Sequence, residues 1–244
     1  MKAAPLPRGE AKVAAVDAMF DAIAPRYDLC NRVISLGLDA GWRRRAVREL
    51  GLPPGNVVVD LACGTGDLCA VLRRAGLRPV GVDRSAGMLA AARHAAAGRA
   101  GAPLVRGDAL RLPFRSGSVD GIVCGFALRN FEALPPVLTE CARVLRPGGR
   151  VSLLEVDTPD SAVLRLGHRV WFGSVVPVVG AALAGTSRVG RERARDAYRY
   201  LPRSVAYLPP PVELNGLLEA AGLTGVRRHR LNGGIAQLLT GTRP

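Results

Sequence analysis

The chain has 244 residues, a formal net charge of +14 at pH 7 and an apolar content of 48%. This length suffices for one α/β domain with a full core, and the apolar content excludes a largely disordered chain. The five cysteines are scattered without a C-x-x-C pair, so we expect neither a disulfide framework nor a metal site. The amino-terminal segment lacks the apolar run of a signal peptide, and we expect a cytoplasmic protein.

The positive charge has four interpretations: attraction to nucleic acid, to an anionic lipid surface or to an acidic substrate, or a solvated basic surface. Aromatic residues make up only 5% of the chain, and they do not alternate with basic residues. This argues against a stacking platform for single-stranded nucleic acid. The sequence also lacks the Asn/Asp-Pro-Pro-Tyr/Phe motif used on flipped bases. Nucleic acid is therefore the least favoured partner.

The first 50 residues show helical patterns. Apolar residues recur at helical spacing within 11–28 until Pro25 interrupts them, and a second helical region covers 27–47. These segments predict helices that cap the domain before its first strand. We expect Trp42 to anchor in the core, with contact to a substrate as the alternative, and the run Arg43–Arg45 to form a solvated helix face.

The most informative stretch follows directly. Val57–Val59 predicts a buried strand, Gly64 and Gly66 form a glycine loop, and a helical pattern begins after Asp67. Strand, glycine loop and helix make up the first unit of a nucleotide-binding α/β domain. The third small residue of the dinucleotide fingerprint is replaced by Cys69, and Asp67 would repel a pyrophosphate. The pattern favours a cationic ligand without phosphates, such as S-adenosylmethionine.

Two acidic residues follow the next two predicted strands. Segment 78–83 ends in Asp83, 19 residues after Gly64, which is about the spacing at which an acid binds ribose hydroxyls. The alternative is that Asp83 caps the following helix. The short strand 104–105 precedes Asp108, which can accept a hydrogen bond from an adenine amino group or be an ordinary turn residue.

Strands and helices alternate along the rest of the chain. Further strands are predicted at 118–125, 150–156, 226–231 and 235–240, with helices at 134–145 and 212–222. Such alternation predicts an α/β fold with a seven-stranded, mostly parallel sheet and helices on both faces. We expect a single domain, divided into an N-terminal helical cap (1–50), a cofactor-binding core (51–158), a helical lid insertion (159–205) and a C-terminal helix with closing strands (206–244).

The predicted lid has an unusual composition. Its longest uncharged stretch, Val170–Ser187, is broken by glycine and proline and falls short of the about 20 apolar residues that a membrane span needs. A cluster of arginines follows at positions 188, 191, 193, 195, 199 and 203. Either the region 163–203 contacts an anionic membrane surface, or its apolar part packs on the sheet and its arginines face water. A homodimer is also left open.

The block Asp60–Asp67, with the sequence DLACGTGD, resembles motif I of the class I S-adenosylmethionine-dependent methyltransferases. Two more particular blocks, 126–130 (FALRN) and 198–204 (YRYLPRS), resemble the C-methyltransferases of menaquinone and ubiquinone biosynthesis. The resemblance runs from about residue 17 to the C-terminus. It implies a Rossmann-like class I fold, S-adenosylmethionine as cofactor and C-methylation of a demethylmenaquinol-like quinol.

The same resemblance implies a set of cofactor-binding residues. They are Asp60, Gly64, Thr65, Gly66, Asp83, Asp108, Ala109 and Gly125. The family has a serine at the position of Gly125, so one hydroxyl contact is missing here. The family's glycine is Ala127 in this chain, and its C-terminal histidine is Leu239. These departures leave open C- or O-methylation of a phenolic or polyketide natural product.

Methyl transfer to a ring carbon requires alignment of the reactants and an adjacent hydroxyl that is ionised or strongly polarised. Our hypothesis is that Arg129 stabilises the phenolate, Asn130 orients it and Tyr27 closes over the cofactor. The alternatives are a structural ion pair for Arg129 and a packed aromatic for Tyr27. A water or an acid such as Asp157 would take the proton. A non-catalytic cofactor-binding protein and a nucleic-acid-binding protein on this fold are the rival interpretations.

Overall fold

The computed structural model describes residues 7–24, 27–95, 101–159, 161–176, 178, 200 and 203–244. Across these ranges, seven strands form one sheet in the order β3-β2-β1-β4-β5-β7-β6. Neighbours from β3 to β5 are parallel, whereas β7 pairs antiparallel with both β5 and β6. The predicted seven-stranded, mostly parallel sheet is confirmed. The strands are β1 (Val57–Leu61), β2 (Arg78–Asp83), β3 (Leu104–Arg106), β4 (Val119–Gly125), β5 (Leu145–Val156), β6 (Thr224–Leu231) and β7 (Ala236–Thr242).

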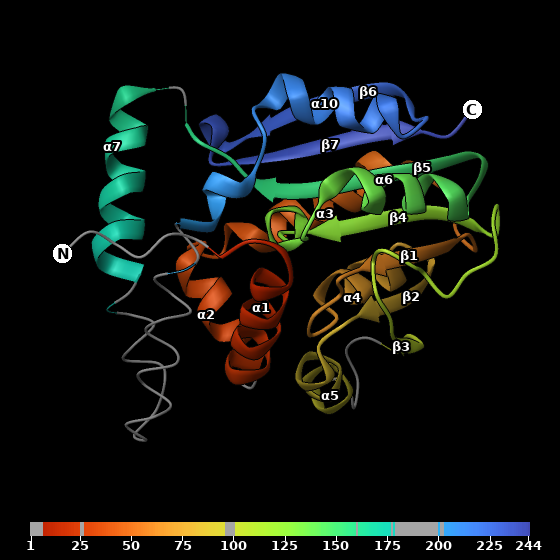
Figure 1. Ribbon diagram of the computed structural model, residues 1–244, viewed down its shortest axis with the longest axis horizontal. Helices are drawn as coiled ribbons and strands as arrows, with labels where there is room; N and C mark the ends of the chain where they lie inside the picture. The colour runs from red at the N-terminus through yellow and green to blue at the C-terminus, as the bar shows by residue number, and fades with distance from the viewer. Residues whose placement is uncertain are drawn as a thin grey trace.

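Helices cover both faces of the sheet (Figure 1). One face carries α3 (Leu38–Leu50) and α4 (Asp67–Arg74), and the other carries α6 (Leu134–Val144) and α10 (Pro211–Ala220). Helix α5 (Ala86–Ala95) packs beside α4 through Leu89 and Cys69. Two further helices, α1 (Gly9–Ile23) and α2 (Tyr27–Ile34), precede α3. Helices therefore precede the first strand, as the sequence predicts.

Strand β1 shows why the sheet is buried on both sides. Val58 packs with Leu50 of α3 and Leu72 of α4, while Val59 packs with Leu138 of α6 on the opposite face. Successive side chains of a strand point to opposite faces, so a strand covered on both faces needs an uninterrupted apolar run. The three consecutive valines of β1 meet this requirement.

Strand β5 begins earlier than the sequence predicts. Leu145 pairs with Val119, the four residues 146–149 interrupt the pairing, and the register resumes at Arg150 opposite Gly121. Gly148 has a φ of +77°, which favours glycine. The Arg-Pro-Gly-Gly segment therefore ends α6 as expected, but it forms an irregularity within the strand rather than a loop before it.

Helix α3 buries one face against the sheet. Its buried positions are 39, 42, 43, 46, 47 and 50, which follow helical i, i+3 and i+4 spacing. Trp42 packs against Leu154 and Leu238, so its predicted role as a core anchor is confirmed. The prediction of a solvated Arg43–Arg45 face is wrong for Arg43, which is 7% exposed, whereas Arg44 is exposed. The helical spacing that buries Trp42 also turns Arg43 inward.

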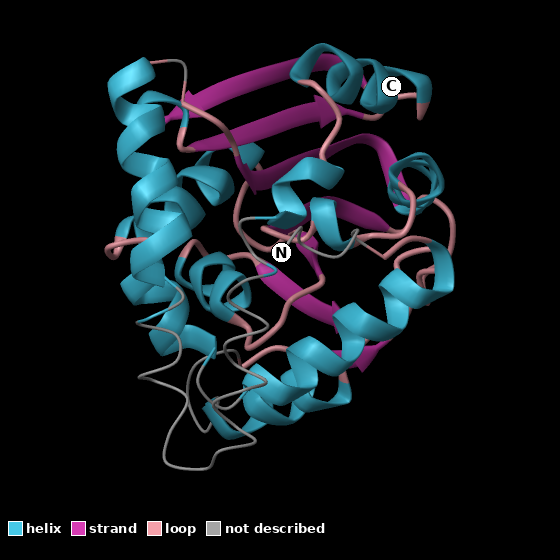
Figure 2. Ribbon diagram, turned by 60° about the vertical axis from the view of Figure 1, so that its left-hand side comes forward, coloured by secondary structure: helices cyan, strands magenta, loops and turns pink. Residues whose placement is uncertain are grey.

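Helices α1, α2 and α7 (Ala162–Val170) gather where the parallel strands end (Figures 1 and 2). Helix α7 continues into a π-helical turn, η3 (Trp171–Val175), and Trp171 Nε1 donates a hydrogen bond to the carbonyl of Ile34 at 2.9 Å. The predicted arginine positions 188–199 lie outside the described residues. No helix in the described ranges is long and apolar enough to cross a membrane.

Four thiols lie in the protein interior: Cys63, Cys69, Cys124 and Cys141 are buried and unpaired. Burial raises the pKa of all four thiols, that of Cys141 to about 12. Cys63 and Cys69 flank the glycine loop, and they pack with Leu89 of α5.

Candidate active site

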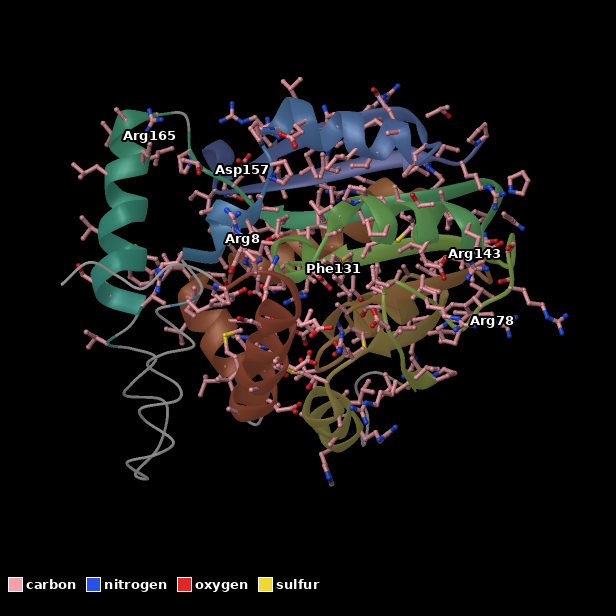
Figure 3. All side chains as sticks on the ribbon, viewed as in Figure 1. Arg8, Arg78, Phe131, Arg143, Asp157 and Arg165 are labelled. Carbon is pink, nitrogen blue, oxygen red and sulfur yellow. The ribbon has the colours of Figure 1, made fainter. Side chains whose placement is uncertain are left out.

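A cleft with about 950 Å³ of open space lies at the carboxyl ends of β1, β2 and β4. Ligands of open α/β sheets bind at this edge, where the strand order reverses. Phe131, one of the lining residues, lies at this end of the sheet, whereas Arg78 and Arg143 lie toward the other end (Figure 3). The cleft wall is mostly apolar and includes Val16, Phe20, Leu61, Val82, Met88 and Val137.

The backbone conformation of the glycine loop requires glycine at positions 64 and 66. Gly64 has a φ of +54° and Gly66 a φ of +86°, conformations in which a Cβ is strained. Gly64 lines the cleft, while the N–H of Gly66 donates to the carbonyl of Cys63 at 2.9 Å and shapes the turn into α4. The sequence did not predict a further left-handed residue, Ala62, whose φ is +55° and which also lines the cleft.

Asp83 joins the glycine loop to the next helix. Its Oδ2 accepts a hydrogen bond from the N–H of Gly64 at 2.8 Å, and its Oδ1 accepts one from the N–H of Ser85 at 2.8 Å. Burial raises the pKa of the Asp83 carboxyl, and these hydrogen bonds oppose that effect. A carboxylate has about four acceptor positions, so two remain for hydroxyl donors from the cleft. The predicted ribose contact is compatible with this geometry, whereas the cap of α5 is Ser85, whose Oγ accepts a hydrogen bond from the N–H of Met88 at 2.9 Å.

An ion-pair network connects α1 to the cofactor loops. Arg84 Nε lies 3.0 Å from Asp17 Oδ2 of α1, and Arg84 Nη1 lies 3.3 Å from Asp108 Oδ2. Asp21 Oδ1, also in α1, accepts hydrogen bonds from Ser85 Oγ at 2.5 Å and from the N–H of Gly87 at 3.0 Å. Helix α1 is thus fastened across the cleft beside Asp108, and Ala109 lines the same cleft.

A smaller polar cavity adjoins the cleft. Arg43, Asp60, Thr65 and Asp67 are among its lining residues, and Gly64, Gly125 and Tyr27 line both spaces. Thr65 Oγ1 donates a hydrogen bond to Asp28. Tyr27 lines both spaces, and burial raises the pKa of its phenol, while its predicted closure over a ligand stays a prediction. This polar cavity continues the apolar cleft toward the start of α4.

Asp60 is the most buried acid of this cavity. It is 1% exposed, its Oδ2 accepts a hydrogen bond from the N–H of Cys69 at 3.1 Å, and its Oδ1 has no hydrogen-bond partner among the described residues. Burial raises the pKa of the Asp60 carboxyl to about 7. A buried acceptor without a donor is costly, and a donor group of a ligand in the cavity would satisfy it.

The Leu128–Asn130 segment forms a short 3₁₀ turn, η2, at the end of β4. Asn130 lines the cleft, and its Oδ1 accepts a hydrogen bond from Tyr200 Oη at 3.3 Å. Arg129 is not among the described lining residues. Its guanidinium is paired with Glu155, and its Nε donates to Ser204 Oγ at 3.0 Å.

Two other expectations can be placed in the structure. Asp157, considered as a proton acceptor, is paired with Arg228 and does not line the cleft among the described residues. The described residues contain no cluster of three or more His, Cys, Asp or Glu side chains that could hold a metal ion.

Comparison with known proteins identifies the family. Residues 8–243 match the model of the ubiE/COQ5 methyltransferase family. The chain belongs to the ubiE/COQ5 methyltransferase family. It is 42% identical over 230 residues to the demethylmenaquinone methyltransferase of Thermus thermophilus, covering 93% of this chain and 100% of that protein. It is 41% identical over 230 residues to the enzyme of the same name from Deinococcus radiodurans, covering 93% and 92%.

Solved structures support the fold of this ubiE/COQ5 family member. An S-adenosylmethionine-dependent methyltransferase from Thermotoga maritima matches with a TM-score of 0.62 at 21% identity, over 94% of this chain and 100% of that one. A methyltransferase from Aquifex aeolicus matches with a TM-score of 0.58 at 15% identity, over 83% and 89%. These structures show the class I methyltransferase fold, and membership of the ubiE/COQ5 family makes the chain a methyltransferase whose methyl donor is S-adenosylmethionine.

The residues of this methyltransferase fit that donor. The left-handed Gly64 opens the loop, Asp83 offers acceptor positions for hydroxyls, and the unpartnered Asp60 Oδ1 suits a cation. When bound, S-adenosylmethionine supplies an electrophilic methyl group next to a sulfonium. Seven of the eight expected cofactor residues line the cleft or the polar cavity. The eighth, Gly66, shapes the turn that leads into α4. Their individual roles stay predictions.

Sequence reasoning missed Arg43 and the two acids of α1. The i, i+3, i+4 spacing of α3 contained the signal for Arg43, because position 43 lies on the same helix face as 39, 46, 47 and 50. Asp17 and Asp21 are four residues apart on α1, so they share a face. Only the fold brings that face against Arg84 and Ser85.

Proposed function

We propose that this methyltransferase transfers the methyl group of S-adenosylmethionine to a ring carbon of a quinol that resembles demethylmenaquinol. The observation that carries the proposal is similarity at 42% and 41% identity, along nearly the whole chain, to proteins named demethylmenaquinone methyltransferase. The mostly apolar cleft with Asn130 at its wall is consistent with an aromatic ring that carries a hydroxyl.

The protein itself contributes by positioning the quinol and by excluding water from the cleft. A quinol hydroxyl has a pKa near 10, so a donor or acceptor must polarise it before the ring carbon becomes nucleophilic. Asn130, with its amide beside the cleft, is suited to orient that hydroxyl. The walls formed by Phe126, Ala127 and Phe131 hold an aromatic ring and exclude water.

In this proposal Arg129 lies behind Asn130 as seen from the cleft and acts by positioning it. Its guanidinium donates to the carbonyl of Phe126 at 2.8 Å as well as to Glu155, so it fixes the turn that carries Asn130. The paired carboxylate reduces the net charge that the guanidinium presents to the cleft. Direct stabilisation of a phenolate by Arg129 stays a prediction.

The test is methyl transfer from labelled S-adenosylmethionine to reduced demethylmenaquinol in detergent, with the position of the label determined in the product. We expect a C-methylated ring, and at least a 10-fold lower kcat for Asn130→Ala. Thr139→Ala, which changes an exposed residue of α6, is the matched control and should leave the rate unchanged. Donor binding without quinol turnover, but with turnover of a phenolic or polyketide acceptor, would overturn the proposed substrate.

The second proposal is that the exposed apolar face of α7 is the surface at which the protein takes up its quinol. Val163, Leu166 and Val170 of α7 are 79%, 59% and 53% exposed, and their i, i+3, i+7 spacing puts them on one helix face. We propose that this face contacts a lipid surface, from which a lipid-soluble quinol enters. The arginines at 188–199 belong to the same proposal from sequence alone, and a homodimer stays a prediction.

Vesicle co-sedimentation tests the lipid contact. We expect binding to anionic vesicles that weakens at least fivefold in the Val163→Ser, Leu166→Ser, Val170→Ser triple variant. Val212→Ser on α10, where the valine is 85% exposed, is the matched control. Equal binding of the triple variant and the control variant would contradict the assignment to α7.

A further inference from the structure

The polar cavity beside the cleft is lined by Arg43 and Asp60, and each of them has one buried side-chain atom without a hydrogen-bond partner among the described residues. Arg43 is 7% exposed and its Nε makes no hydrogen bond with the described residues, while Asp60 Oδ1 has no donor there. The nearest carboxylates to Arg43 Nε are those of Asp39 at 3.5 Å and Asp67 at 3.8 Å, beyond ordinary hydrogen-bond length. Burying such atoms without hydrogen-bond partners is unfavourable, and a ligand that carries both a negative and a positive group would satisfy both of them.

Gly125 gives a ligand access to Arg43. A Cβ at this position would lie 3.3 Å from Arg43 Nη1 and 2.9 Å from Leu68 Cδ1, so both side-chain ends would have to shift to make room for it. Gly125 lines both the cleft and the polar cavity, so it stands where the two spaces meet. The glycine leaves the guanidinium uncovered at the point where an extended ligand would pass from one space to the other.

We propose that Arg43 binds the α-carboxylate of the methionine part of S-adenosylmethionine, and that Asp60 accepts from its α-ammonium group. The inference deepens the cofactor role of the cleft and rests on it. An Arg fork suits a carboxylate because it offers several N–H donors in one plane. The Phe126 ring, whose centroid is 5.5 Å from Arg43 Cζ, supports the guanidinium from one side. Arg43 thereby provides an anchoring contact in a chain that lacks a hydroxyl at position 125.

The charges around the cavity agree with this assignment. Among the described lining residues, Arg43 is the one cation and Asp60 and Asp67 are the acids. A ligand with one carboxylate, one ammonium and one sulfonium has a net charge of +1, which complements this set. A neutral thioether nucleoside without the amino-acid part would leave both Arg43 and Asp60 unsatisfied.

Isothermal titration calorimetry with two ligands tests the role of Arg43. The ligands are S-adenosylmethionine and decarboxylated S-adenosylmethionine, which differ only in the carboxylate. We expect Arg43→Gln to weaken binding of the first about 30-fold and of the second less than threefold, in keeping with the loss of one charged hydrogen-bonded contact. Arg43→Lys, which keeps the positive charge, should give an intermediate loss. Arg44→Gln, at the exposed neighbouring position, is the matched control and should change neither affinity.

The outcomes separate the inference from the cofactor assignment. Equal weakening of both ligands by Arg43→Gln, or no weakening of either, would overturn the inference while leaving the cofactor assignment intact. Failure of the wild-type chain to bind either ligand would overturn the cofactor assignment itself. Thermal melting of each variant shows whether it is folded, and Arg43→Lys supplies the comparison if Arg43→Gln is not.

Discussion

Glu155, near the end of β5, accepts hydrogen bonds from both the guanidinium and the backbone N–H of Arg129. Glu155 is fully buried, and Arg129 is almost so. Through the hydrogen bond from Arg129 Nε to Ser204 Oγ the same pair reaches the C-terminal end of the segment 159–205, for which the sequence predicts a lid. One ion pair thus joins β5, the turn that carries Asn130 and Ser204.

Removing one partner of this pair should destabilise the fold strongly. Arg129→Ala leaves the Glu155 carboxylate buried without its cation, and we expect the free energy of unfolding to fall by about 3–5 kcal/mol. The double variant Arg129→Met, Glu155→Leu should recover most of that loss, because it buries no charge. Urea unfolding followed by circular dichroism measures both. A loss for Arg129→Ala equal to that of an exposed arginine, such as Arg44→Ala, would refute this prediction.

Asp60 should give the protein a pH dependence of known sign. Its pKa is about 7 in the folded protein against 3.8 for an unperturbed carboxyl, because burial disfavours the charged form. Between these values the folded state binds more protons than the unfolded state, so this carboxyl makes the free energy of unfolding fall as the pH rises from about 4 to about 7. Asp60→Asn should remove that contribution. Urea titrations of both proteins across this range test the prediction, and parallel curves would contradict it.

Two glycine substitutions should have opposite effects. Gly64→Ala places a Cβ at a φ of +54°, which costs about 1–2 kcal/mol, and should also weaken donor binding because the loop lines the cleft. Gly216→Ala lies at an exposed, uncrowded position within α10 and should stabilise the fold by about 0.5–1 kcal/mol. Thermal unfolding and calorimetry distinguish them. Stabilisation by both would show that the Gly64 conformation is not required.

Helix α1 should slow the release of the methyl donor. Asp21→Ala removes acceptors for Ser85 Oγ and the N–H of Gly87, and we expect the dissociation rate of S-adenosylmethionine to rise about 10-fold. Asp17→Asn breaks only a partly exposed pair with Arg84 and should have a smaller effect. Stopped-flow displacement measures both rates. An unchanged rate in Asp21→Ala would show that α1 does not control release.

The sequence predicted those features that are local. The apolar run 57–59 and the segment 78–83 indicated their strands because their residue types favour buried sheet, and Asp83 followed from the spacing to the glycine loop. The pairing of Arg129 with Glu155 joins residues 26 positions apart, and no local pattern encodes it. Arg43 was assigned to solvent since three consecutive arginines are usually a solvated face, yet helical spacing turns one of them inward.

The two acids on α1 illustrate the same limit. Their spacing put them on one helix face, but what that face meets depends on how α1 crosses the sheet edge. The left-handed conformations of Ala62 and Phe126 at the ends of β1 and β4 were equally beyond sequence reasoning, because neither residue type favours them. Both residues line the cleft, where local strain is held by the surrounding structure.

The four interior thiols provide the protein with its own labelling reporter. Because they are buried and their pKa values are raised, Cys63, Cys69, Cys124 and Cys141 should resist alkylating reagents while the chain stays closed. Each alkylation event would then record an opening of the interior, and mass spectrometry would assign it to a residue. With Cys30 changed to Ser, slower labelling of Cys63 and Cys69 than of Cys141 on addition of the methyl donor would localise the protection to the glycine loop.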